Sequence, residues 1–441
     1  MNNSNKYYVT PISKSVTGKQ VTVCVPGSKS ITNRALLLAA LSNGTSTLSG
    51  VLFSDDSRHF LSCLIELGFP VSYDEEAKTV TITGFQGEIP NKQATIYVGS
   101  AGTAARFLTA MLGFCEGTYT IEASNQMKKR PMDSLMDCLE QLGCHITYLE
   151  QEKFLPCILT HTNNDVSSIT VNIEKSSQFL SALLISSCLH NKDLTIHTTG
   201  THGMSYIHIT TKMMEQFGYP ITYTKTENGY TFFGKSSAMY QSKNYFIEPD
   251  VSSASYFYAM AALFGCSITV KNVFFSSMQG DIKLLSILEQ MGCTVVETED
   301  GVCVTGPSNK KLKGLTIDMS SCSDQTMTVA CLSVFADSKT TITGISHIRF
   351  QESNRIKAIC TELTKMGIDC VEFEDGITIT PGTPKPTLVN TYEDHRMAMA
   401  FSLIGLRSEG IVIDNPSCCS KTFETYFEVL ENTINRLQTI Q

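Results

Sequence analysis

The sequence has no hydrophobic run long enough to cross a membrane. Its longest run, Tyr256–Phe264, has about nine residues, whereas a membrane-spanning helix needs roughly 20. The first 19 residues are mostly polar and lack the apolar stretch of a signal peptide. We therefore expect a soluble protein of the cytoplasm.

Excess positive charge and metal-binding motifs are also missing. The chain has 34 Lys and Arg against 42 Asp and Glu, a formal net charge of -8. This balance argues against a protein that binds mainly nucleic acid or anionic membranes. The 16 cysteines are scattered, no CxxC occurs, and no Cys/His cluster has the spacing of zinc ligands. We interpret the cysteines as reduced core residues and expect no metal site.

A glycine at the end of an amphipathic helix recurs at intervals of 75, 75, 74 and 75 residues. The five copies are Gly68, Gly143, Gly218, Gly292 and Gly367. Each suits a left-handed helix end, and each is followed by a short pair of alternating strands. The 441 residues, enough for two or three domains, are therefore built from repeats.

A second helix recurs between the first ones and is apolar nearly all round, so we expect it to be buried. Its six copies are SITNRALLLAAL, AGTAARFLTAML, SSQFLSALLISS, SSASYFYAMAAL, SDQTMTVACLSVF and DHRMAMAFSLIGL. The repeat then reads βαβαββ, and six repeats divide into two lobes of three. A period of this length exceeds that of common solenoids and favours a pseudo-symmetric α/β architecture. Converging helix N-termini in such a lobe favour the binding of anions.

Arginine is rare in the chain and is concentrated near these helix starts. Six of the nine arginines lie there: Arg34, Arg106, Arg130, Arg349, Arg355 and Arg396. The guanidinium fork suits phosphate and carboxylate groups, although Arg349 and Arg106 could instead form salt bridges between repeats. The segment Pro26–Ser30 (PGSKS) resembles a phosphate loop but lacks the glycine spacing of a Walker A motif.

Eight segments, found between residues 26 and 427, resemble the 5-enolpyruvylshikimate-3-phosphate synthase family, the 3-phosphoshikimate 1-carboxyvinyltransferases. They are PGSKSITNRALLLAAL, SAGTAARFL, MKKRPM, KSSQFLSALL, IEPDVSSASYF, FQESNRI, YEDHRMAMAFSL and SKTFETYF. The resemblance implies an inside-out α/β barrel in two lobes, each with three βαβαββ repeats. We expect one lobe to span residues 24–249 and the other residues 1–23 and 250–441, with the active site in the cleft between them.

The resemblance also implies a reaction of the shikimate pathway, which leads to chorismate and the aromatic amino acids. The enolpyruvyl group of phosphoenolpyruvate passes to the 5-hydroxyl of shikimate-3-phosphate through a tetrahedral ketal, and phosphate is released. No cofactor is implied, and we expect a monomer that acts on small molecules and is a target of glyphosate.

Matching positions in the family motifs imply the site residues. The catalytic residues are Asp324 as proton acceptor, Glu352 as second carboxylate and Lys29, which shares in acid–base work. The residues expected to bind shikimate-3-phosphate are Lys29, Ser30, Arg34, Ser176, Ser177, Gln178, Tyr206, Asp324, His347 and Gln351. The residues expected to bind phosphoenolpyruvate are Lys29, Gly102, Arg130, Gln178, Arg355, Arg396 and Lys421.

Five positions depart from the family pattern. Ser100 replaces an asparagine, Phe107 a proline, His347 an asparagine, Gln351 a lysine, and Gly203 a substrate-binding serine. These changes bear on individual substrate contacts rather than on the reaction.

Other interpretations of the same residues are simpler. Asp324 could be an ordinary helix cap, and Glu352 could merely pair with Arg355. The sister enzyme that acts on UDP-N-acetylglucosamine shares the fold, but its first motif carries Lys-Asn where this chain has Lys29-Ser30. A non-catalytic anion-binding protein would be favoured by loss of the three catalytic side chains, and all three are present.

Overall fold

The computed structural model describes residues 5–162, 165–200 and 203–439 and divides the chain into two compact units. Residues 27–247 form the middle unit, and residues 1–26 with 248–441 form the terminal unit. The chain therefore passes between units after Pro26 and again after Ile247. The resemblance implied passages after residues 23 and 249.

Each unit has three buried helices at its centre. Those of the middle unit are α1 (Lys29–Leu41), α3 (Gly102–Gly113) and α5 (Gln178–Ser186). Those of the terminal unit are α7 (Val251–Phe264), α9 (Thr326–Ser333) and α11 (His395–Arg407). Every residue of α3, α7 and α9 is buried, as expected for helices that are apolar on all sides.

A second set of helices alternates with the first along the chain. They are α2 (Asp55–Glu66), α4 (Asp133–Gln141), α6 (Met204–Gln216), α8 (Leu284–Gln290), α10 (Arg355–Lys365) and α12 (Tyr426–Thr439). The first five end near the recurring glycines, whose φ angles lie between 79° and 106°. This left-handed conformation suits glycine, so the predicted helix ends are confirmed.

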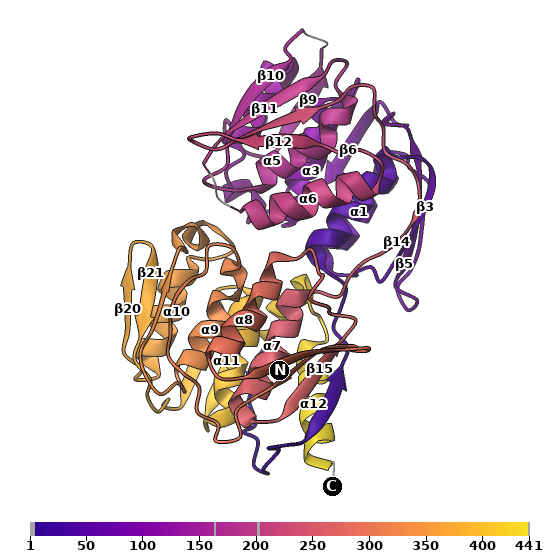
Figure 1. Ribbon diagram of the computed structural model, residues 1–441. Coiled ribbons are helices and arrows are strands. Elements are labelled where there is room, and N and C mark those ends of the chain that lie inside the picture. The colour runs from indigo at the N-terminus through magenta and orange to yellow at the C-terminus, as the bar shows by residue number, and fades with distance from the viewer. Residues whose placement is uncertain (1–4, 163–164, 201–202, 440–441) are drawn as a thin grey trace. The chain divides into compact units, whose positions relative to one another are not determined.

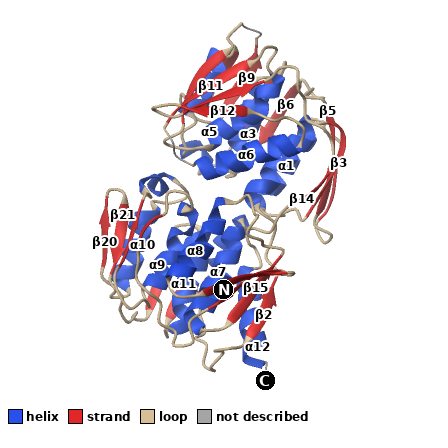
Figure 2. Cartoon of the chain, viewed as in Figure 1, coloured by secondary structure: helices blue, strands red, loops and turns tan. Residues whose placement is uncertain are grey.

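Six small sheets lie outside the buried helices of their own unit (Figure 2). In the middle unit they are β14 (Asn244–Phe246), β3 (Asn43–Ser49), β5 (Thr79–Phe85) and β4 (Val71–Asp74); β6 (Gln93–Tyr97), β7 (Thr118–Glu122), β9 (Cys157–His161) and β8 (Cys144–Tyr148); and β10 (Ser168–Asn172), β11 (Leu194–Thr199), β13 (Tyr230–Gly234) and β12 (Thr222–Lys225). In the terminal unit they are β16 (Thr294–Thr298), β17 (Gly301–Thr305), β15 (Ser267–Lys271) and β2 (Gln20–Val23); β18 (Thr316–Asp318), β19 (Thr340–Thr343), β21 (Gly376–Ile379) and β20 (Cys370–Phe373); and β1 (Lys6–Tyr8), β23 (Ile411–Asp414) and β22 (Thr387–Val389). With helices inside and sheets outside, each unit has the expected inside-out α/β fold.

The last repeat departs from the βαβαββ pattern. Its sheet has three strands, and α12 is followed by no further strand in the described part of the chain. Instead β1 pairs antiparallel with β23, with Tyr7 opposite Ile413. The N-terminal strand therefore covers the edge that a final hairpin covers in the other repeats.

Two strands lie directly before the points at which the chain passes between units, and each pairs within the unit that the chain is leaving; Figure 1 shows one of them, β14, beside β3. β2 directly precedes the passage into α1, yet it pairs in parallel with β15 of the terminal unit. β14 directly precedes the passage into α7, yet it pairs in parallel with β3 of the middle unit. Each unit therefore holds, by strand pairing, the segment that directly precedes the passage to the other unit.

The cysteines are mostly, but not all, core residues. All 16 are free thiols and 12 of them are buried, whereas Cys24 is exposed. No helix in the described residues is long and apolar enough to span a membrane.

Candidate active site

One buried arginine of the terminal unit binds three carboxylates. Arg355 donates from Nε to Asp394 Oδ2 (2.8 Å), from Nη1 to Asp324 Oδ1 (3.0 Å) and from Nη2 to Glu352 Oε2 (2.9 Å). Its side chain is 1% exposed. Burial alone would lower the pKa of Arg355, but the three carboxylates together raise it above its usual value. This guanidinium is therefore a fixed positive charge around which the acidic groups are held.

Two further cations complete this group, which we call the carboxylate cluster. Arg396 Nη2 lies 2.7 Å from Asp324 Oδ2, and Lys421 Nζ lies 3.5 Å from Glu352 Oε1. Three cations thus meet three carboxylates, and the buried charges balance. The pairing interpretation of Glu352 is incomplete, because this carboxylate contacts Lys421 as well as Arg355.

Helix starts and short 3₁₀ turns bring these side chains together. Asp324 lies in η4 (Ser323–Gln325) directly before α9, Arg355 opens α10, and Lys421 ends η6 (Pro416–Lys421). The cap residue of α9 is Gln325, so Asp324 is not an ordinary helix cap. Asp394 has that role for α11, where its side chain accepts a hydrogen bond from the backbone N–H of Arg396.

Two of the departures from the family pattern lie beside the carboxylate cluster. Gln351 accepts a hydrogen bond from Arg355 Nη1, and His347 Nε2 lies 2.8 Å from Ser323 Oγ. Both side chains therefore contact protein groups at the edge of the predicted site. Arg349 instead donates to Phe373 O of β20 (2.8 Å) and lies 3.9 Å from Glu372 Oε1, so these contacts stay within its own repeat and do not link two repeats.

Asp281 is an acidic neighbour of the carboxylate cluster to which no sequence motif pointed. It lies in η3 (Gly280–Lys283) and accepts a hydrogen bond from Ser252 Oγ. Burial, together with the negative charge of Asp324, raises the pKa of Asp281 to about 6. Asp281 therefore keeps its proton to a higher pH than an ordinary aspartate and ionises as the pH rises through about 6.

We expect Asp281→Asn to stabilise the protein at alkaline pH. Folding raises the pKa of Asp281 from the ordinary aspartate value of 3.8 to about 6, so its favourable contribution is present below pH 3.8 and is lost as the pH rises through about 6. At roughly 1.4 kcal/mol per pKa unit, the variant gains up to about 3 kcal/mol at about pH 8 and nothing near pH 4. Thermal unfolding at both pH values measures this, with exposed Asp300→Asn as the control. An equal gain at both pH values would contradict it.

In the middle unit, Arg34 is a buried cation with uncharged partners. Its Nε donates to Thr210 Oγ1 (2.8 Å), Nη1 to Ser30 O (2.9 Å), and Nη2 to Ser181 Oγ (3.2 Å) and Tyr206 O (3.3 Å). Burial lowers the pKa of Arg34 to about 10, so the side chain remains charged at neutral pH. Because each of these acceptors is neutral, the positive charge can act on an anion. The contacts join Arg34 to two predicted binding positions through their backbone oxygens.

Arg106 and Gln178 link α3 to α5 at their N-terminal ends. Arg106 Nη1 donates to Gln178 Oε1 (2.5 Å), while Gln178 Nε2 donates to Thr103 Oγ1 (3.1 Å). The backbone N–H of Gln178 donates to Ser176 Oγ (3.2 Å). The predicted positions 176 and 178 therefore lie together with Arg106, which connects two repeats through a neutral amide rather than through a carboxylate.

Gly102 and Gly203 lie where a side chain would collide with predicted site residues. A Cβ atom at Gly102 would lie 2.5 Å from Arg130 Nη1 and 2.9 Å from Arg106 Nη1. A Cβ atom at Gly203, whose φ is +69°, would lie 2.5 Å from Ser177 Oγ. The structure thus places Gly102 beside Arg130, and a serine at 203 would require Ser177 to move.

Lys29, the first residue of α1, has an acidic partner that its motif did not indicate. Its Nζ lies 3.7 Å from Asp56 Oδ2, and the side chain of Asp56 is 3% exposed. Asp56 belongs to α2, and no periodic signal in the sequence pointed to this contact.

Phe107, at the family's proline position, is buried, with the Arg34 guanidinium 5.3 Å from the centre of its ring.

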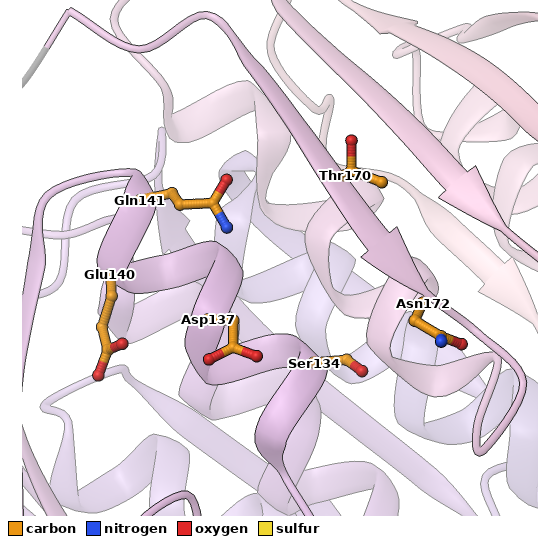
Figure 3. Close-up of a pocket in the computed structure, with 6 residues that line it drawn as sticks. All are labelled: Ser134, Asp137, Glu140, Gln141, Thr170 and Asn172. Atoms are coloured by element: carbon orange, nitrogen blue, oxygen red, sulfur yellow. The ribbon is translucent and has the colours of Figure 1, made fainter.

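A separate cavity of about 570 Å³ lies between α4 and β10 of the middle unit (Figure 3). It is lined by Ser134, Asp137, Glu140, Gln141, Thr170 and Asn172. None of these residues belongs to the predicted site, and Lys153 pairs with both Asp137 (2.8 Å) and Glu140 (2.6 Å). We assign no ligand to this cavity.

Comparison with known proteins identifies the family. The family model for EPSP synthase (3-phosphoshikimate 1-carboxyvinyltransferase) matches residues 13–430. The chain is 42% identical over 407 residues to the 3-phosphoshikimate 1-carboxyvinyltransferase of Trichormus variabilis, covering 92% of this chain and 94% of the relative. It is 40% identical over 415 residues to 3-phosphoshikimate 1-carboxyvinyltransferase 2 of Halalkalibacterium halodurans, covering 93% and 91%.

A solved structure has the same fold as this chain. The solved structure of EPSP synthase from Acinetobacter baumannii superposes with a TM-score of 0.80 at 24% identity, covering 97% of this chain and 98% of the other. The chain belongs to the EPSP synthase family. Its reaction is the transfer of the enolpyruvyl group from phosphoenolpyruvate to shikimate-3-phosphate in the shikimate pathway.

Proposed function

We propose that the middle unit supplies most of the shikimate-3-phosphate contacts and that the carboxylate cluster carries out proton transfer beside phosphoenolpyruvate. The observation that carries this proposal is the geometry of Arg355 and Arg396, which hold Asp324 from both sides. Two guanidinium groups favour the ionised carboxylate, which is the form that can accept a proton from the 5-hydroxyl.

Glu352 is the second catalytic carboxylate in this proposal. Lys421 and Arg355 hold it within the same cluster as Asp324. The family reaction needs a proton at the methylene carbon of phosphoenolpyruvate and its removal when the ketal breaks down, and Glu352 and Lys29 are the groups we assign to these transfers. The developing and departing negative charge of phosphate is stabilised by Arg355, Arg396 and Lys421.

The remaining assignments follow the positions that match the family motifs. Shikimate-3-phosphate is bound by Ser30, Arg34, Ser176, Ser177, Gln178 and Tyr206, with Asp324, His347 and Gln351 at the reacting side. Phosphoenolpyruvate is bound by Lys29, Gly102, Arg130, Gln178, Arg355, Arg396 and Lys421. Because both sets are needed for one reaction, we propose that the two units close on the substrates and form the active site in the cleft between them.

The test is phosphate release with both substrates, and with either one omitted. Phosphate is expected only when shikimate-3-phosphate and phosphoenolpyruvate are present together. Replacement of shikimate-3-phosphate by UDP-N-acetylglucosamine tests the sister activity and is expected to give none. Ligand binding without phosphate release would favour the non-catalytic interpretation.

We also propose that the enzyme is a monomer of the cytoplasm. Its 16 free thiols suit a reducing compartment. Size-exclusion chromatography with light scattering is expected to give a mass near 48.4 kDa, and a mass twice as large would contradict the monomer.

Glyphosate is expected to compete with phosphoenolpyruvate, and Gly102→Ala should weaken its binding by more than about tenfold, or about 1.4 kcal/mol. The added methyl group would displace the guanidinium tips of Arg130 and Arg106, which lie within 2.9 Å of it. Inhibition constants for the wild type and the variant measure the effect, with KM for shikimate-3-phosphate as an internal control. Equal inhibition constants would show that this turn does not line the inhibitor site.

A further inference from the structure

Two consecutive residues just before the carboxylate cluster have left-handed backbone conformations. Tyr392 has φ +56° and Glu393 has φ +57°, although neither is glycine. Residues other than glycine rarely adopt this backbone conformation, and it persists only where surrounding contacts hold it. The next residue is Asp394, which caps α11 and contacts Arg355. This strained turn therefore determines where Asp394 and Arg396 lie.

A buried carboxylate of α10 holds the turn. Glu362, with no exposed side-chain surface, accepts hydrogen bonds from Tyr392 Oη (2.7 Å), the backbone N–H of Asn390 (3.1 Å) and Lys365 Nζ (2.6 Å). Burial and the hydrogen bond to Glu362 raise the pKa of Tyr392 to about 12, so the phenol remains a donor. The turn is thus fixed by a side-chain contact and a backbone contact to one acidic group.

Helix α10 supports the turn at two points. Arg355, at its first residue, binds Asp394 through Nε (2.8 Å), and Glu362, about two helical turns later, binds Tyr392. Asp394 in turn accepts a hydrogen bond from the backbone N–H of Arg396 (3.0 Å). A shift of the turn would therefore move both the Asp394 carboxylate and the base of the Arg396 side chain.

We propose that Tyr392 and Glu362 are positioning residues that hold Arg396 in place for phosphoenolpyruvate. This inference rests on the proposed assignment of Arg396 to that substrate. Neither Tyr392 nor Glu362 needs to touch a substrate, because both act through the strained turn and Asp394.

The test is Tyr392→Phe, which removes only the hydroxyl group. Loss of one hydrogen bond to a buried carboxylate is expected to raise KM for phosphoenolpyruvate about fivefold and leave KM for shikimate-3-phosphate unchanged within about twofold. The control is Tyr7→Phe, because Tyr7 Oη donates to Glu431 Oε1 (2.8 Å) in the same unit, outside the carboxylate cluster. Tyr7→Phe should change neither KM.

A proportional rise in both KM values, or equal behaviour of the two variants, would overturn the positioning role. If Tyr392→Phe folds poorly, Glu362→Gln is measured in the same way, and the same selective rise is required. Arg396→Lys separates this inference from the proposed function. If Arg396→Lys leaves KM for phosphoenolpyruvate unchanged, the substrate assignment of Arg396 is wrong; if it raises KM while Tyr392→Phe does not, only the positioning role is wrong.

Discussion

Replacing Asp324 by asparagine is expected to lower kcat by at least about 10³-fold without raising KM for phosphoenolpyruvate. The amide keeps the shape of the side chain but cannot accept the proton of the 5-hydroxyl. Arg355 and Arg396 lose one competing negative charge, while Arg355 retains Asp394 and Glu352 as partners. With less negative charge beside them, the two guanidinium groups should therefore bind an anionic substrate at least as well as before.

Steady-state kinetics with each substrate varied in turn measure both effects. The matched control is Asp337→Asn, the same substitution at an exposed position of the terminal unit, which should leave kcat unchanged. A kcat within tenfold of the wild type would contradict the role of Asp324 as proton acceptor. A large rise in KM with unchanged kcat would instead make Asp324 a binding residue only.

The repeated part of the fold is predictable because the same two kinds of helix recur in each repeat and each kind has a recognisable sequence pattern. A helix that is apolar on all sides has to be buried, and an amphipathic helix that ends at a left-handed glycine has to turn back onto its sheet. Gly68 and Gly292 mark two such ends, with φ of +88° and +106°. These are local properties, and each of them leaves a pattern in the sequence.

The pairing of the two strands that precede the passages between units, and the incomplete last repeat, leave no such local pattern. β2 and β14 have ordinary strand sequences, and their partners β15 and β3 are determined by long-range packing. Likewise, nothing in the short strand Lys6–Tyr8 shows that it closes the sheet of the last repeat, more than 400 residues later. Pairing of distant strands depends on which edges remain free after the repeats have formed.

The candidate site shows the same limit. The arginines at helix starts were predictable from residue type and position, and Arg355 and Arg396 do lie together. The groups around these arginines, Asp281 and Glu362, were not predictable from the sequence. Both are single acidic residues, and their burial is determined by other elements of the fold. The sequence alone does not show whether a given carboxylate will be exposed to solvent or buried against another side chain, as Glu362 is against Tyr392.

Replacing Lys29 by methionine is expected to lower kcat by at least about 10²-fold. Methionine keeps much of the length of the side chain but removes a cation that we place at both substrates. The loss of charge also leaves Asp56, with 3% of its side chain exposed, without the ammonium group 3.7 Å away. We therefore expect a lower unfolding temperature as well, because a buried charge without its partner is costly.

A second substitution separates catalysis from stability. In Lys29→Met with Asp56→Asn, the orphaned charge is gone, so the unfolding temperature should return towards that of the wild type while kcat stays at least about 10²-fold low. Lys92→Met is the control for the substitution itself, since Lys92 pairs with Glu88 (2.6 Å) at the surface of the same unit. Recovery of kcat in the double variant would contradict the catalytic role of Lys29, because activity would then follow the stability of the Lys29–Asp56 pair rather than the presence of the ammonium group.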